Sequence, residues 1–412
     1  MNRRHFLQAS ASGLATLLPI SRHAWALSAP APTQRKLVVI MLRGAVDGLN
    51  VVVPYGDADY YQLRGSIAAP KPGIANGVLD LDGFYGLHPA MNALLPLWQS
   101  QSLAFIHACG SPDATRSHFD AQDYMESGTP GRKGTPDGWM NRTLGQLPGP
   151  SSPTRGMAIG ATLPRILSGA IATANIEAGA NATKADLLDK PAVADAFAEL
   201  YKGDSHLARA YQDARQTHQE VMLSASAMDT EMIKANAGAP LPNGFPADAT
   251  RLARMLRSDA RMQMVFMALG GWDTHVNQGG ATGQLANRLS PLAQGLAALA
   301  QGLGPLYQDT TIVVMSEFGR TAHQNGTGGT DHGHGNVMWL LGGNVAGGKV
   351  LGQWPGLASG SLHENRDLAI TTDFRQVLAR VASQHLRLDD HALASIFPQA
   401  PAADASLALY LA

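Results

Sequence analysis

The chain has 412 residues, of which 45% are hydrophobic and 15% charged, and its formal net charge is −1. This composition is that of a globular protein long enough for one large α/β domain or for two smaller domains. A nucleic-acid or anionic-membrane partner would require a basic surface, and this charge balance argues against both. The single cysteine, Cys109, excludes an internal disulfide and is expected to be a buried apolar side chain.

The first residues have the pattern of an export signal. Arg3-Arg4 is followed by Phe6-Leu7 and by the moderately apolar run Ala9–Ile20, which is too short and too polar to span a membrane. This pattern resembles a twin-arginine signal, and Ala24-Trp25-Ala26 has the small-x-small pattern of a cleavage site. We therefore expect residues 1–26 to be a signal peptide and the twin-arginine export machinery to be a partner. The mature protein would then be periplasmic or secreted, without a stable membrane anchor.

Strand and helix patterns alternate along the rest of the chain. In chain order we expect a strand at Lys36–Leu42, a helix at His88–Gln99, a strand at Leu103–Cys109, helices at Lys184–Tyr201 and His206–Ala235, a loop at Gly238–Ala247, a strand at Gln263–Leu269, a helix at Gly283–Leu303, strands at Thr311–Met315 and Val337–Leu341, and a helix at Asp373–Gln384. This alternation predicts an α/β fold with a mostly parallel sheet. We expect one domain over 27–412 with a helical insertion at about 184–260; two independent domains are the alternative.

Polar side chains gather at the ends of these predicted strands. They are Asp47, Arg116, Ser117, Asp273, His275, Glu317 and Arg320 after four strands, and Asp331, His332 and His334 before the last one. Because ligands bind beyond the carboxyl ends of parallel strands, we expect these groups to lie together. Carboxylate with imidazole is the ligand set of Zn, Mn or Fe, whereas carboxylate alone suits Mg or Ca. The sequence thus predicts a divalent metal ion (Zn, Mn, Mg or Ca) with ligands among Asp47, Asp273, His275, Glu317, Asp331, His332 and His334.

Each of these residues alone also has a simpler interpretation. An Asp after a strand commonly caps a turn, Ser117 is the residue type that helix N-caps favour, and Arg320 stands three residues after Glu317, where it would form a salt bridge. The segment 331–334 is more specific, because three ligand-type residues fall within four positions. The gathering of polar groups after several strands favours a functional cluster.

Several short blocks resemble one bacterial family. The blocks are Arg43–Asn50, Arg116–Phe119, Asp273–His275, Ser316–Thr321, Gly329–Gly333 and Thr371–Arg375. Over nearly the whole mature chain, the sequence resembles the bacterial family of exported proteins catalogued as domain of unknown function family 1501. That family is distantly similar to the alkaline phosphatase and sulfatase superfamily. The resemblance implies a three-layer α/β/α fold with a doubly wound, mostly parallel sheet.

The superfamily resemblance also implies roles for the polar residues. One metal ion would be held by Asp47 and Glu317, and another by Asp273, His275 and His332 or His334. Ser117, or Thr115, stands where the superfamily has its nucleophile, and Ser117 would be the attacking group. Arg116 or Arg320 would bind the oxygens of a phosphate or sulfate ester. The sequence departs from the superfamily at Phe318, where a metal-binding histidine is usual. A site with two metal ions is therefore in doubt.

Two functions fit these residues. The first is a metal-dependent hydrolase of a small anionic phosphate or sulfate ester. The second is a catalytically inactive extracytoplasmic binding or assembly protein on the same scaffold, which Phe318 favours because a phenyl ring binds no metal. A redox protein is disfavoured by the single cysteine, and no G-x-G-x-x-G fingerprint of a dinucleotide site follows the first strand.

Overall fold

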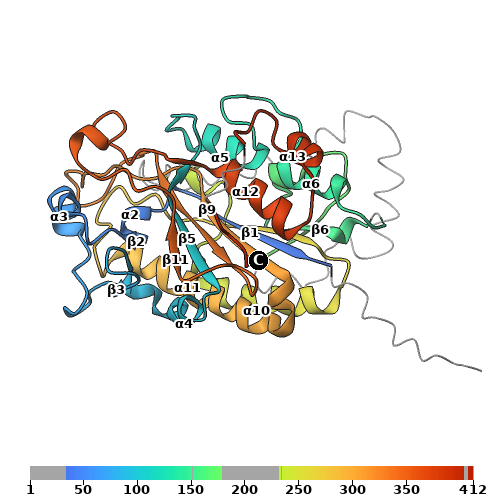
Figure 1. The fold of residues 1–412 in the computed structure, drawn as a ribbon, viewed down its shortest axis with the longest axis horizontal. Coiled ribbons are helices and arrows are strands. Elements are labelled where there is room, and N and C mark those ends of the chain that lie inside the picture. Colours follow the sequence, from blue (N-terminus) through green and yellow to red (C-terminus); the bar gives the residue numbers. More distant parts are fainter. Residues whose placement is uncertain (1–33, 151, 179–231, 233, 403–406, 412) are drawn as a thin grey trace, which may run out of the picture. The chain divides into compact units, whose positions relative to one another are not determined.

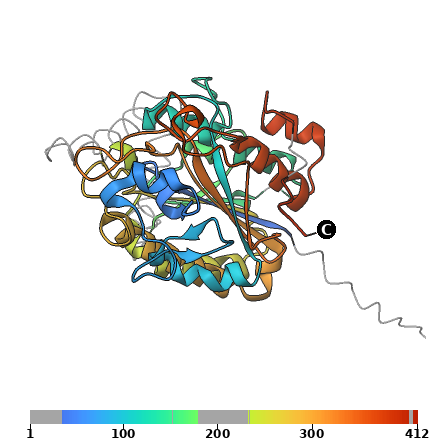
Figure 2. The same ribbon diagram turned by 60° about the vertical axis from the view of Figure 1, so that its left-hand side comes forward.

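A nine-stranded sheet runs through the part of the chain that the structure, a computed structural model, describes (Figures 1 and 2). The described residues are 34–150, 152–178, 232, 234–402 and 407–411. The predicted signal peptide, the helix predicted at Lys184–Tyr201 and nearly all of the one predicted at His206–Ala235 lie outside them. Most of the predicted insertion at 184–260 therefore lies outside them too.

The strand order places the ends of four long strands at one edge. The strands are β1 (Lys36–Leu42), β5 (Leu103–Gly110), β6 (Gly156–Ile159), β7 (Ala174–Ile176), β8 (Met264–Leu269), β9 (Thr310–Ser316), β10 (Asn336–Leu341), β11 (Lys349–Leu351) and β12 (Thr372–Asp373). Their order is β11-β5-β10-β9-β1-β8-β6-β7, with β12 beside β5. All pairs are parallel except those of β10 with β5 and β9. Strands β1, β5, β8 and β9 therefore end at the edge where the reversed β10 begins.

The five predicted strands are confirmed to within one residue at each end, and the mostly parallel sheet is confirmed as well. Four strands were not predicted from the sequence: β6, β7, β11 and β12. Strands of two to four residues carry too few positions for an apolar pattern to stand out. A second, three-stranded sheet was also missed for this reason; its strands are β2 (Val52–Val53), β3 (Leu79–Asp80) and β4 (Gly86–Leu87).

Each face of the large sheet is covered by helices, which makes the fold three-layered (Figure 1). In β1, Val38, Ile40 and Leu42 join the core on one face, and the alternate residues join the core on the other. The first face carries α4 (Leu95–Gln99), α10 (Phe245–Ser258) and α11 (Gln284–Leu303). The opposite face carries α5 (His118–Ser127), α6 (Trp139–Gln146), α12 (Phe374–Arg380) and α13 (Asp390–Ile396). The expected α/β/α architecture is confirmed.

Several helix boundaries differ from those predicted. The helix predicted at His88–Gln99 is a 3₁₀ segment, Pro89–Leu94, followed by α4, because Pro96 lacks the amide that a continuous helix would use. The predicted closing helix is α12 followed by a π-helical turn, Val381–His385. The predicted loop at Gly238–Ala247 is shorter, since α10 begins at Phe245 with a proline in its first turn.

The remaining helical segments are short. They are α2 (Gly48–Val51), α3 (Ala58–Arg64) and 3₁₀ turns at Gly65–Ile67, Pro153–Arg155, Arg165–Leu167, Pro242–Gly244, Gly304–Asp309 and Ser359–Ser361. None of the helices in the described ranges is long and apolar enough to cross a membrane.

The contact between α10 and α11 depends on a glycine. A Cβ atom at Gly295 would lie 2.1 Å from Cδ1 of Phe245, whose side chain is buried in the core. We expect Gly295→Ala to destabilise the protein by about 1–3 kcal/mol through overpacking, which outweighs the roughly 1 kcal/mol gained in helix propensity. Gly145→Ala in α6 is the matched control, because its Cβ would meet nothing closer than 3.7 Å. Urea unfolding should show that variant unchanged or stabilised; equal effects of the two would contradict the packing argument.

Candidate metal centre

Side chains from three separate segments converge at the edge where β5, β8 and β9 end. His118 is the first residue of α5, Asp273 follows β8, and His332 precedes β10. One ligand atom of each lies within 4.8 Å of the others. The structure therefore gathers two imidazoles and one carboxylate from residues more than 50 positions apart in the chain.

The distances within this group fit a single metal ion. The two Nε2 atoms of His118 and His332 lie 3.0 Å apart. The Asp273 carboxylate lies 3.3 Å from Nε2 of His332 and 3.6 Å from Nε2 of His118. Ligand atoms around a tetrahedral ion with bonds of about 2.0–2.1 Å are about 3.3 Å from one another. Three protein ligands also leave one coordination position open, as in catalytic zinc sites.

A third imidazole lies beside this group. Nε2 of His275 is 2.9 Å from Oδ1 of Asp273 and 3.0 Å from Nε2 of His332. Its side chain is 28% exposed, about twice the exposure of His118. His275 and His332, which is 25% exposed, thus form the solvent side of the cluster, and His275 is either a fourth ligand or a neighbour of the open position.

The far nitrogen of each ring has its own acceptor. Nδ1 lies 2.7 Å from Glu317 Oε1 in His118, 3.0 Å from Asp331 Oδ1 in His275 and 2.9 Å from the Arg116 carbonyl oxygen in His332. Such an acceptor keeps a proton on Nδ1 and points Nε2 toward the cluster. Metal-binding histidines in proteins are oriented in the same way.

Electrostatics favour a cation at this position. Burial alone would raise the pKa of Asp273, but hydrogen bonds from the three histidines and the charge of Arg320 outweigh burial and hold that pKa far below its usual range. Burial would also raise the pKa of the fully buried Glu317, yet His118 and Gln122 hold it low. Both carboxylates are therefore ionised. Burial opposes the charging of His118, but the same two carboxylates raise its pKa to about 9.

Arg320, one of two arginines predicted to bind the ester, is committed to Asp273. Its side chain is buried, with Nη1 donating to Oδ1 of Asp273 over 2.6 Å and Nε donating to Oγ1 of Thr330 over 3.1 Å. Arg320 therefore holds the Asp273 carboxylate in place, rather than forming the salt bridge with Glu317 that the sequence spacing suggested.

Asp47 is linked to the three ligands through other side chains. Its Oδ2 accepts hydrogen bonds from Arg64 over 2.5 Å and from Gln278 over 2.6 Å, and both Asp47 and Arg64 are fully buried. Gln278 in turn accepts a hydrogen bond from Thr330, the partner of Arg320. The guanidinium of Arg64 thus supplies the positive charge that a metal ion at Asp47 would have supplied.

The other predicted residues surround the centre in different ways. Glu317 and Asp331 orient histidine rings, as described above. The ring of His334 stacks on that of His363 with centroids 4.3 Å apart, and burial lowers its pKa to about 4. Exposed Ser117 is the N-cap of α5, where its Oγ accepts the amide proton of Asp120 over 3.4 Å.

His118 was not among the metal ligands predicted from the sequence. It stands next to Ser117 in one of the blocks that carry the family resemblance, so that block was the available signal. Phe318 packs with ring centroids 4.8 Å from His118 and 5.3 Å from His332. The phenyl group that departs from the superfamily pattern therefore forms an apolar wall of the cluster.

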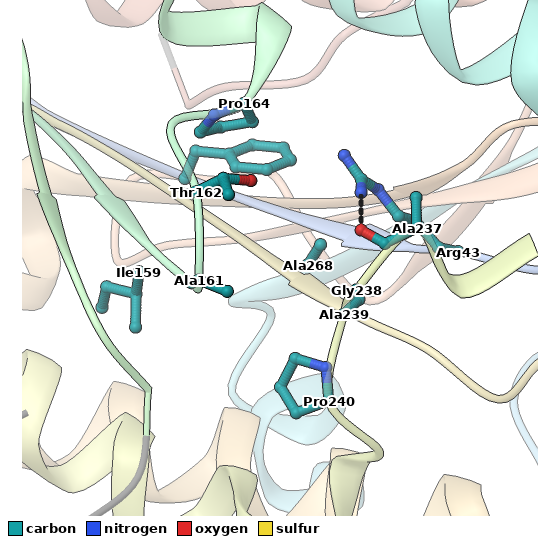
Figure 3. A pocket seen from close by; sticks show the side chains of 12 residues that line it. Arg43, Ile159, Ala161, Thr162, Pro164, Ala237, Gly238, Ala239, Pro240 and Ala268 are labelled. Carbon is teal, nitrogen blue, oxygen red and sulfur yellow. Dashed lines mark hydrogen bonds between the residues drawn. The ribbon is translucent and has the colours of Figure 1, made fainter. Parts of the chain in front are cut away.

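A small cavity lies at the same edge of the sheet, beyond β6 and β8 (Figure 3). Its volume is about 60 Å³, and Arg43 lies at its rim, donating to the Ala237 carbonyl oxygen over 2.9 Å and to Glu126 over 2.5 Å. The next residue, Gly44, donates its amide proton to Oε1 of Glu317 over 2.7 Å. The rim of the cavity and the metal centre are thus joined through one short segment after β1.

Residues 34–397 match the family described as "Protein of unknown function (DUF1501)". The chain belongs to this family. No curated protein matches the sequence.

Several solved structures are similar to this chain over most of its length. The C-terminal periplasmic domain of EcEptC from Escherichia coli in complex with Zn has 10% identity and a TM-score of 0.35, covering 76% of this chain and 73% of that one. An alkaline phosphatase superfamily protein from Vibrio parahaemolyticus has 10% identity and a TM-score of 0.37, covering 78% and 63%. Alkaline phosphatase from the Antarctic bacterium TAB5 has 11% identity and a TM-score of 0.32, covering 90% and 100%. At these low scores, the function of this chain rests on its own side chains.

The orientation of His118 by Glu317 can be tested. We expect Glu317→Gln to weaken Zn²⁺ binding about 10- to 100-fold, the usual cost of losing a partner that orients a metal-binding histidine. Asp120→Asn is the matched control, since this acid of α5 pairs with Lys133 on the surface. Competition with a chromogenic zinc chelator measures both affinities. Unchanged affinity in Glu317→Gln would contradict the assignment of His118 as a ligand.

Proposed function

We propose that this chain is an exported, metal-dependent hydrolase of phosphate or sulfate esters. The convergence of His118, Asp273 and His332 is the observation that carries the proposal. Each ring in this group has a separate acceptor on its far nitrogen, an arrangement that is typical of metal-binding histidines in proteins.

The residues fit one metal ion. His118, Asp273 and His332 would hold it, with His275 beside the open position. When bound, a divalent ion polarises an ester oxygen and lowers the pKa of a water molecule at neutral pH. Glu317 and Asp331 would keep the rings oriented, and Phe318 would exclude bulk water from one side. A second ion at Asp47 is disfavoured, because Arg64 already neutralises that carboxylate.

Arg116 is the side chain best suited to bind an ester anion. Its side chain is 33% exposed, and its Nη2 is anchored by Glu364 and Asp367. Within the described residues its Nη1 has no hydrogen-bond partner, so that nitrogen is available to an oxygen of the substrate. The backbone carbonyl of Arg116 also orients the ligand His332, and Arg116 stands two residues before the ligand His118 in the chain.

A second candidate function is an exported protein that binds an anion without turnover. Ser117 favours it, because its Oγ makes a helix-cap contact and has no histidine or carboxylate base as a partner in the described part of the chain. Hydrolysis in which Ser117 attacks the ester would need such a base, or activation by the metal.

Metal content and ester hydrolysis decide between the two candidates. We expect the purified mature protein to carry about one equivalent of a divalent metal, in line with its single set of ligands, and to hydrolyse para-nitrophenyl phosphate or sulfate. His332→Ala should lose both properties, whereas His323→Ala, which replaces an exposed histidine, should keep both. Mass spectrometry of the metal and a colorimetric assay measure the two properties.

Each outcome has a separate meaning. Metal that is lost in His332→Ala, together with no hydrolysis of either ester by the wild type, would support the binding protein. Hydrolysis that disappears in Ser117→Ala while metal is retained would identify Ser117 as the nucleophile. A wild-type protein that takes up no metal on dialysis against Zn²⁺ or Mn²⁺ would overturn the hydrolase and leave the binding protein.

Export can be tested on the paired arginines. We expect the double variant Arg3→Lys/Arg4→Lys to remain in the cytoplasm, because the twin-arginine pathway recognises that pair. Arg22→Lys changes an arginine of the same segment outside the pair and should leave export unchanged. Cell fractionation with immunoblotting measures the distribution. Normal export of the double variant would contradict the twin-arginine signal.

A further inference from the structure

Asp367 is a buried carboxylate outside the ligand cluster that contacts two arginines at once. Its Oδ2 lies 2.8 Å from Nη2 of Arg116 and 3.5 Å from Nη1 of Arg366, and its side chain is fully buried. Its Oδ1 is also buried and has no hydrogen-bond partner among the described residues. A buried carboxylate of this kind is stable only when it is paired, so its charge holds these two guanidinium groups.

Both arginines then act on the same histidine. The backbone carbonyl of Arg116 accepts the Nδ1 proton of His332 over 2.9 Å. Nη2 of Arg366 donates to the backbone carbonyl of His332 over 2.6 Å. His332 is therefore held at its ring and at its backbone by two residues that share one anchor, Asp367.

The backbone around Asp367 reinforces this arrangement. Asp367 forms antiparallel bridges with Thr321 and with His363, and the amide of Ala322 donates to the Arg366 carbonyl oxygen. The loop of Asp367 is thus attached to the loop that follows β9, which also carries Glu317. The segment of Asp367 thus contacts the loop after β9 through its backbone and the segment of Arg116 through its carboxylate.

We infer that Asp367 is a positioning residue that fixes the metal-binding orientation of His332 through Arg116 and Arg366. This inference rests on the metal centre of the proposed function. Because Arg116 is also the proposed anion-binding side chain, Asp367 links the position of a metal ligand to the position of the group that binds the substrate oxygens. Loss of its charge should therefore weaken metal binding and anion binding together.

Glu364→Gln provides a matched control. Glu364 contacts the same Nη2 of Arg116 over 2.5 Å, but its side chain is 55% exposed and no contact with Arg366 or His332 is present in the described residues. Exposed ion pairs contribute little. An effect that arises from Asp367 alone would therefore separate the buried anchor from the general loss of a negative charge near Arg116.

The test is a Zn²⁺ titration of metal-free protein, followed by titration of the zinc-loaded protein with inorganic phosphate and with sulfate. We expect Asp367→Asn to weaken Zn²⁺ binding about 10- to 100-fold and to weaken binding of the anion that the wild type takes. Glu364→Gln should stay within about twofold of wild type for Zn²⁺. The visible spectrum of the Co²⁺-loaded protein should also shift in Asp367→Asn, since it reports ligand geometry, which a loss of stability alone would not change.

The outcomes separate this inference from the proposed function. If the wild type binds Zn²⁺ and a folded Asp367→Asn protein matches its affinity and Co²⁺ spectrum, the positioning role is overturned and the hydrolase proposal stands. If the wild type binds no metal, the proposed function is overturned and the inference with it. If Asp367→Asn does not fold, Arg366→Gln replaces it, because this side chain is 37% exposed. Weaker Zn²⁺ binding in that variant supports the inference, and unchanged binding overturns it.

Discussion

The site depends on one buried carboxylate, that of Asp273. An isolated ionised carboxylate inside a protein would be protonated or expelled, so its surroundings must supply positive charge or donors. Arg320 supplies a charge-assisted hydrogen bond, and three imidazoles surround the remaining lone pairs. Because Arg320 is itself held by Thr330, the carboxylate is fixed before any ligand arrives. This pairing explains why histidines from three separate segments point toward a single position.

The same principle explains the roles of the two other buried acids. Asp47 is neutralised by Arg64, and Glu317 is satisfied by His118, Gln122 and the amide of Gly44. Each acid thus has a different compensating partner. Only at Asp273 do several imidazoles share the task, and an imidazole nitrogen becomes a metal ligand when it gives up its proton. Carboxylates that look equivalent in the sequence are therefore not equivalent as ligands.

Much of the fold followed from the sequence, because long apolar runs such as those of β1 and β9 predict buried strands directly. The direction of β10 could not be predicted, since an apolar run reads the same for a parallel and for an antiparallel strand. A connection without a helical pattern between β9 and β10 was the available cue, because parallel neighbours need a crossover. Short strands such as β7 had too few residues to be recognised.

The sequence predicted the location of the site more reliably than the role of each residue in it. Asp273, His275 and His332 were named, and the structure places them in contact. His118 was passed over for its neighbour Ser117. The pairing of Asp47 with Arg64 depends on how the chain folds back after α2, and no spacing rule reveals it. Roles are set by which partner compensates each charge, and that information lies in three dimensions.

The reversal of β10 also bears on how the site assembles. His332 meets Arg320, only 12 positions away, in an antiparallel bridge, whereas its partner His118 is 214 positions away. Closing the longer loop costs about 2–3 kcal/mol more in chain entropy, at roughly 0.6 kcal/mol for each doubling of length. The β9–β10 hairpin therefore provides a local half of the centre at low entropic cost. The distant His118 and Asp273 join it only when β5 and β8 have paired into the sheet, so the complete metal centre is present only in the fully folded protein.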